Sequence, residues 1–199
     1  MNKEWLLKVI KDAHDNAVDK GFYPVDEGKN IGELLMLCVS ELGEALEAHR
    51  CDRYADIKSL NICTINIENI NHEWIGLFQR DIKDTVEDEL GDVFIRLADL
   101  CGYLVERENH DIVVQNFLNT KRLIPTDINV GEWMFHYIRF FLSDIDFYED
   151  KNYIPAGSIG RALAELSSFA ASQKIDIAKF VEAKMAYNRT RPPKHGKRY

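Results

Sequence analysis

The sequence of 199 residues lacks the signals that mark several common protein classes. No apolar run approaches the roughly 20 residues that cross a bilayer, and the N-terminus lacks the long apolar core of a signal peptide. The four cysteines show no CxxC spacing, which argues against a zinc site and against a disulfide framework. A glycine-rich phosphate loop, a nucleophilic triad and the Glu-x-x-His pairs of di-iron bundles are also missing. We therefore expect a cytoplasmic protein that does not associate with membranes.

The composition favours a single folded domain over residues 1–199. Hydrophobic residues make up 46% of the chain, which is enough for an ordinary core, and there is no linker, low-complexity tract or convincing repeat. The formal net charge of −8 argues against non-specific binding to nucleic acid. An acidic protein that binds an acidic ligand needs cations, either metal ions or a local basic cluster.

Apolar residues recur with helical spacing through most of the chain, which predicts an all-α fold. The stretch 51–78 is different, because its isoleucines and threonine also allow a short β-hairpin, and 107–128 is predicted to be a connection. Asp176 is the predicted N-cap of the last helix, and Pro192-Pro193 ends that helix. The predicted helices span 2–19, 31–50, 80–106 and 131–148, and two more follow Pro155 and Asp176.

Two pairs of carboxylates stand out, Glu41-x-x-Glu44 and Glu89-x-x-Asp92. A spacing of three places both members of a pair on one helix face, and each pair borders the apolar stripe of its helix. Glu47, in contrast, lies deeper in the polar arc and is expected to be solvated. Two helices that turned these faces towards each other would gather four carboxylates, an arrangement that requires hard cations such as Mg²⁺, with Mn²⁺ as a substitute. The alternative is that both pairs are ordinary solvated faces.

The C-terminal segment is basic and offers candidate phosphate contacts. Lys184 and Asn188 share a helix face, and Arg191 begins the run Arg-Pro-Pro-Lys-His-Gly-Lys-Arg-Tyr. Such residues can bind phosphates through charge-assisted hydrogen bonds. The alternative is a solvated basic tail.

Taken together, the ordered carboxylate pairs and the run Lys184-x-x-x-Asn188-x-x-Arg191, followed by Lys-His-Gly-Lys, resemble the MazG-like all-α nucleoside triphosphate pyrophosphohydrolases. The resemblance covers about 1–50, 80–106 and 174–199. It implies that the carboxylates bind Mg²⁺ and form the catalytic set, and that the C-terminal residues contact phosphate. The implied catalytic and metal-binding residues are Glu41, Glu44, Glu89 and Asp92, and the implied substrate-binding residues are Lys184, Asn188 and Arg191.

The family's reaction would be hydrolysis of an NTP or dNTP between the α and β phosphates, giving the monophosphate and pyrophosphate, as in enzymes that clean the nucleotide pool. Family members are usually dimers or tetramers, so a homodimer or homotetramer is an expectation. Two segments depart from the compact family pattern: 51–80 is longer, and 107–173 inserts at least two helices before the last one. Because of these insertions, the sequence does not determine which base and sugar are preferred or how the chains assemble.

Two other readings stay open. The protein could be a non-catalytic helical module that binds a nucleotide as a sensor or binds a partner protein. It could also bind nucleic acid through its basic C-terminal segment, although the net charge argues against this.

Overall fold

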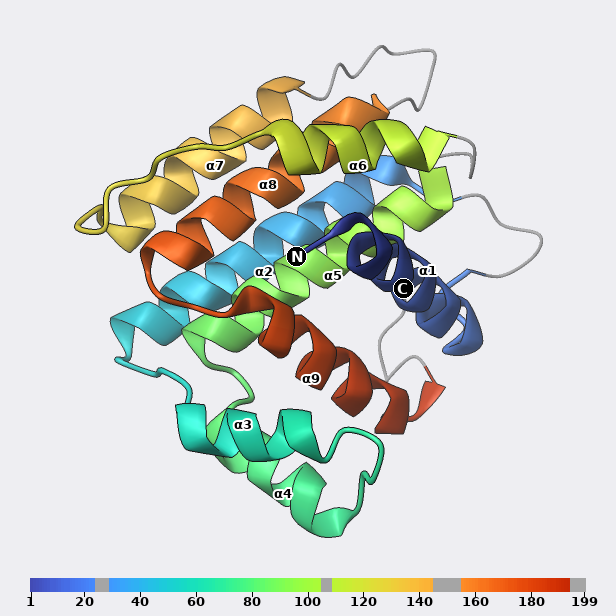
Figure 1. Cartoon of the computed structure of the whole chain (residues 1–199), viewed down its shortest axis with the longest axis vertical. Helices are drawn as coiled ribbons and strands as arrows, with labels where there is room; N and C mark the ends of the chain where they lie inside the picture. The colour runs from blue at the N-terminus through green and yellow to red at the C-terminus, as the bar shows by residue number, and fades with distance from the viewer. Residues whose placement is uncertain (24–28, 105–108, 145–154, 194–199) are drawn as a thin grey trace.

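The computed structural model describes residues 1–23, 29–104, 109–144 and 155–193, and within these ranges the protein is an all-α bundle (Figure 1). This confirms the predicted fold class. None of the described helices is both long and apolar enough to cross a membrane. The helices are α1 (Lys3–Asp19), α2 (Ile31–Arg50), α3 (Ile57–Ile65), α4 (His72–Asp81), α5 (Val86–Leu104), α6 (His110–Asn119), α7 (Val130–Asp144), α8 (Ala156–Ser172) and α9 (Ile177–Thr190).

Asparagine and aspartate side chains cap the N-termini of the first four helices. Asn2, Asn30, Asp56 and Asn71 each accept a hydrogen bond from the backbone N–H three residues further on, over 2.7–3.2 Å. Such caps satisfy backbone donors that a helix cannot pair internally. Asp176 occupies the predicted N-cap position of α9, but its side chain makes no capping hydrogen bond.

The predicted hairpin in 51–78 is wrong, because this stretch forms α3 and α4. The buried apolar side chains of this stretch recur with helical spacing. One small cluster against α9 contains Leu60 and Cys63 from α3 and Trp74 and Phe78 from α4. Burial of this face outweighs the β-propensity of Ile62 and its neighbours. The next helix consequently starts at Val86, six residues later than predicted, because α4 ends at Asp81.

The predicted connection 107–128 is also wrong in part, since it contains α6. This helix packs closely along α8 (Figure 1). A Cβ atom at Gly160 of α8 would lie only 2.3 Å from the Val113 carbonyl oxygen of α6, so the two backbones meet where no side chain fits. The helix predicted at 131–148 appears as α7, and positions 145–148 lie outside the described residues.

Helix α5 lies at the centre of the bundle and packs against α1, α2, α8 and α9 (Figure 1). Its core residues Leu90, Val93, Phe94 and Leu97 are completely buried. The pair α3–α4 lies beyond α9 at one end of the molecule (Figure 1). Because α2 and α9 both contact α5, polar residues on these three helices can meet near the N-terminal half of α5.

Candidate metal centre

Three of the four predicted carboxylates come together where α2 packs against α5. Glu41 lies on α2, and Glu89 and Asp92 lie in the first two turns of α5. One oxygen atom from each lies within 4.8 Å of the others. Glu41 and Glu89 are only 6% and 3% exposed, whereas Glu44 is exposed and lies outside this group of three.

A cavity of about 180 Å³ opens onto this carboxylate group. All four predicted carboxylates line it, Glu44 included, and Lys184, Asn188 and Arg191 line it from α9 and its C-terminal end. The candidate phosphate contacts therefore face the same space as the carboxylates. The basic residues at 194–199 lie outside the described residues.

Lys184 is almost fully buried and bridges two carboxylates of α5. Its Nζ lies 2.5 Å from an oxygen of Asp88 and 2.7 Å from an oxygen of Asp92. Burial alone would lower the pKa of Lys184, but Asp92, Asp88 and Glu89 outweigh burial and raise it, so the ammonium stays charged.

Sequence reasoning missed Asp88, which is completely buried. Its spacing of four from Asp92 places both side chains on one face of α5, and this spacing is the signal that could have found it. Burial raises the pKa of Asp88 to about 6 in spite of the neighbouring Lys184.

Arg96 supplies the second cation of the site. Its guanidinium donates from Nε to Oε1 of Glu41 over 3.0 Å, and its Nη2 lies 3.0 Å from the same oxygen. Burial alone would lower the pKa of Arg96, but Glu41 and Asp92 outweigh this effect and raise it. The arginine thus holds Glu41 in a fixed orientation at the edge of the cavity.

Within the group of three carboxylates, the two buried members, Glu89 and Glu41, have raised pKa values in the absence of a cation. Burial is the main cause at Glu89, where the pKa rises to about 8 although Lys184 opposes the rise. At Glu41, burial and then the charge of Asp92 raise the pKa, and Arg96 opposes this. A cation between these groups would favour their ionised forms, so binding should release protons.

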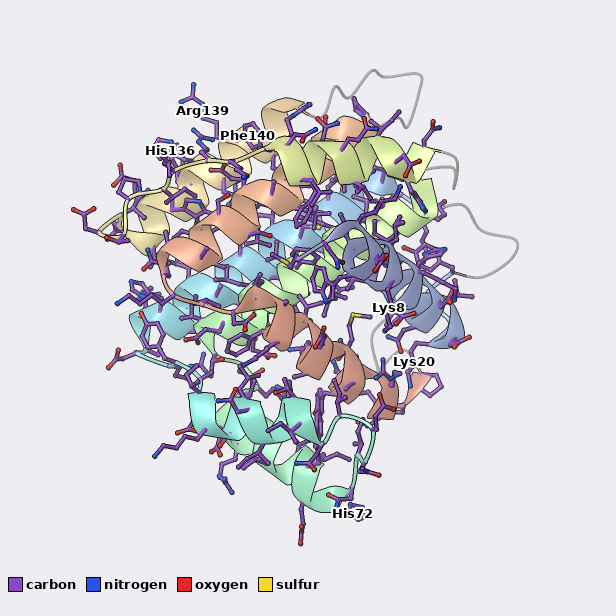
Figure 2. The ribbon with its side chains drawn as sticks, viewed as in Figure 1. Lys8, Lys20, His72, His136, Arg139 and Phe140 are labelled. Atoms are coloured by element: carbon purple, nitrogen blue, oxygen red, sulfur yellow. The ribbon has the colours of Figure 1, made fainter. Side chains whose placement is uncertain are left out.

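Hydrogen bonds from α1 and the segment after it secure the rim of the cavity. Asp99, which lines the cavity, accepts hydrogen bonds from Nδ1 of His14 and from the hydroxyl of Tyr23, both over 2.9 Å. Lys20, labelled in Figure 2 near the end of α9, donates to the carbonyl oxygens of Arg189 and Arg191. These bonds fix the backbone at the end of α9, from which Arg191 lines the cavity.

The donor set suits a hard divalent cation. Octahedral Mg²⁺ binds oxygen at about 2.0–2.1 Å, so its ligands lie no more than about 4.2 Å apart. The oxygens of Glu41, Glu89 and Asp92 lie within 4.8 Å, so small side-chain rotations would bring them into range. The cavity lining holds six carboxylates and four cationic side chains, which leaves an excess of negative charge once all the carboxylates are ionised. These residues therefore fit a bound divalent cation without specifying which one.

No family model, curated protein or solved structure matches this chain.

Proposed function

We propose that this protein is a Mg²⁺-dependent nucleoside triphosphate pyrophosphohydrolase, which converts an NTP or dNTP and water into the monophosphate and pyrophosphate. One observation carries the proposal. Carboxylates from α2 and α5 and the polar residues Lys184, Asn188 and Arg191 line a single cavity. A cation site beside phosphate-binding groups is what phosphoryl chemistry requires, because that chemistry depends mainly on positioning and charge neutralisation.

Glu41, Glu89 and Asp92 would hold the Mg²⁺, for which Mn²⁺ would substitute. When bound, the ion would polarise a phosphoryl oxygen and lower the pKa of water. Arg96 orients Glu41, and Lys184 orients Asp92, through the ion pairs described above. Glu44 lies exposed at the rim, one turn beyond Glu41, so it is available to a ligand that enters the cavity.

Asn188 and Arg191 would bind the phosphate chain. The guanidinium of Arg191 can donate two parallel hydrogen bonds to phosphate oxygens, and the Asn188 amide can donate a further one. The cavity of about 180 Å³ is smaller than the about 300–1,000 Å³ that hold drug-sized ligands. It therefore suits cations and phosphates, and the sugar and base would lie outside it.

Pyrophosphate release from a panel of ribo- and deoxyribonucleoside triphosphates, with Mg²⁺ or Mn²⁺, tests the proposal. Glu41→Gln and Asp92→Asn should abolish release. Glu47→Gln is a matched control, because Glu47 is an exposed carboxylate on the same helix as Glu41 and lies outside the cavity lining. Equal release by the wild type and both site variants would contradict the assignment.

The competing proposal is a non-catalytic nucleotide-binding module. It gains some support from Arg96 and Lys184, which already neutralise part of the carboxylate charge. Calorimetry that finds Mg²⁺-dependent nucleotide binding without turnover would favour it. The resemblance also leads us to expect a homodimer or homotetramer, and light scattering of the purified protein would measure the assembly. The expected compartment, from the sequence features given above, is the cytoplasm.

A further inference from the structure

The geometry points to a second role for Lys184: it is a built-in counter-cation that competes with the metal ion for Asp92, and Asp88 retains it when the metal ion binds. This inference rests on the metal site of the proposed function. It adds a residue, Asp88, whose part would be to position Lys184 and not to touch the ion or the substrate.

Asp92 is shared between two cation positions. One of its oxygens lies 2.7 Å from Nζ of Lys184, and Asp92 also belongs to the group of three carboxylates whose oxygens lie within 4.8 Å. An ion bound by that group would draw on the charge that now pairs with Lys184. Ammonium and metal ion therefore compete for one carboxylate.

Asp88 differs from Asp92 because it pairs with Lys184 without belonging to the carboxylate group. It is completely buried, and its Oδ2 accepts from both Nζ of Lys184 and the backbone N–H of Asp84, the latter over 3.1 Å. Its Oδ1 is buried without a hydrogen-bond partner among the described residues, so the carboxylate has spare capacity for the ammonium. A buried lysine ammonium without any anionic partner would strongly destabilise the folded protein.

This arrangement couples metal binding to the position of Lys184. Coupling is reciprocal: if the Lys184–Asp92 pair weakens metal binding by some factor, then metal binding weakens that pair by the same factor. When the metal ion binds and Asp88 is present, Lys184 loses its ion pair with Asp92 but keeps its ion pair with Asp88. Without Asp88, Asp92 is the remaining ion-pair partner of Lys184 among the described residues, so Lys184 resists displacement from it.

A double-mutant cycle on cation affinity tests the inference. Calorimetry with Mg²⁺ and with Mn²⁺, without nucleotide and at one fixed pH, compares the wild type, Asp88→Asn, Lys184→Met and the double variant. We expect Asp88→Asn to weaken binding about tenfold when Lys184 is present, a typical size for coupling between sites. In the Lys184→Met background the same change should have a much smaller effect. An equal effect in both backgrounds would mean that only the long-range charge of Asp88 matters, and would overturn the inference.

Nuclear magnetic resonance of ¹⁵N-labelled lysine gives a direct readout that does not need Lys184→Met to fold. In the wild type, saturating Mg²⁺ should shift the Lys184 ammonium signal yet leave it slow to exchange, because Asp88 still holds it. In Asp88→Asn, Mg²⁺ should abolish the slow exchange. A Lys184 signal that does not respond to Mg²⁺ in the wild type would overturn the inference.

Lys179→Met is the matched control, since Lys179 lies on the same helix, is partly exposed and pairs with Asp176 away from the cavity. It should leave cation affinity unchanged. The outcomes also separate this inference from the proposed function. If no cation binds even the wild type, both fail. If cations bind and triphosphates are hydrolysed but the double-mutant cycle shows no coupling, the proposed function stands and only the inference that Lys184 competes with the metal ion is wrong.

Discussion

The interfaces α2–α5 and α6–α8 differ in how acidic side chains are arranged around them. At α2–α5, Glu41, Glu89 and Asp92 converge from two helices, and Lys184 and Arg96 balance part of their charge. On α8, Glu165 is 6% exposed, pairs over 3.2 Å with Arg122 from the segment after α6 and does not line the cavity. A buried acid alone therefore does not mark a candidate site. The distinguishing feature is that several acidic side chains converge on one cavity.

The two regions also differ in how closely a glycine approaches the neighbouring helix. Gly160 brings α8 against the backbone of α6, whereas a Cβ atom at Gly91 of α5 would lie 3.6 Å from Phe180 of α9, which is an ordinary contact. The sticks in Figure 2 fill the spaces between the ribbons with side chains throughout the bundle. Residues of α2, α5 and α9 line the cavity described above, whereas α6 and α8 leave no room for a side chain at Gly160.

The largest expected effect comes from removing a charge from each buried acid in turn. Glu89→Gln should lower Mg²⁺-dependent pyrophosphate release about 1,000-fold, since a bound metal ion is worth several kcal/mol to such a reaction. Glu165→Gln should leave the rate unchanged. The measurement is the initial rate of release at saturating triphosphate. A similar loss in both variants would show that buried acids matter for folding in general and would erase the distinction between the two interfaces.

The next largest effect should come from the close approach of α6 and α8. Gly160→Ala forces a methyl group against the Val113 carbonyl and should lower the free energy of unfolding by about 3 kcal/mol, which urea denaturation measures. Gly76→Ala on α4 is the control, because a Cβ atom at Gly76 would meet nothing within 4 Å. This variant should raise the free energy of unfolding by about 0.5–1 kcal/mol. If Gly160→Ala is as stable as the wild type, the two helices can separate without cost.

A smaller effect should appear in the pH dependence of stability without metal. Burial raises the pKa of Glu89 from 4.5 to about 8, so between these values the folded state holds a proton that the unfolded state has released. The contribution of Glu89 to stability then falls as the pH rises from about 5 towards about 8. We expect the melting temperature in a chelating buffer to fall over this range, and Glu89→Gln to flatten the fall. A melting temperature that rises through this window would contradict the role of burial at Glu89.

The smallest effect should be that of Glu44→Gln. Glu44 is exposed and lies outside the group of three carboxylates, so its loss should reduce pyrophosphate release only about tenfold, at the low end for loss of a supporting contact. Direct comparison with Glu89→Gln under identical conditions measures the difference. Equal losses would mean that Glu44 moves inward to bind the ion together with the other three.

The helix 31–50 was predicted with the bounds that the structure gives, because its apolar periodicity and the cap Asn30 act within the segment itself. The errors in 51–78 and 107–128 have the opposite origin. Ile62 and Ile65 have strong β-propensity, yet both are exposed on α3. That helix is fixed by packing against α4 and against α9, which lies far along the chain. Local propensity could not reveal a contact of this kind.

The sequence by itself determined which side chains share a helix face, because a spacing of three or four residues fixes their directions on any helix. It therefore identified the carboxylate pairs and the polar face of the last helix. Only the tertiary structure decided that Glu41 meets Glu89 and Asp92, that Glu44 stays at the rim and that Lys184 pairs with Asp88. The physical reason is that periodicity is a property of one helix, whereas the distance and rotation between helices depend on how the side chains of the whole core pack together.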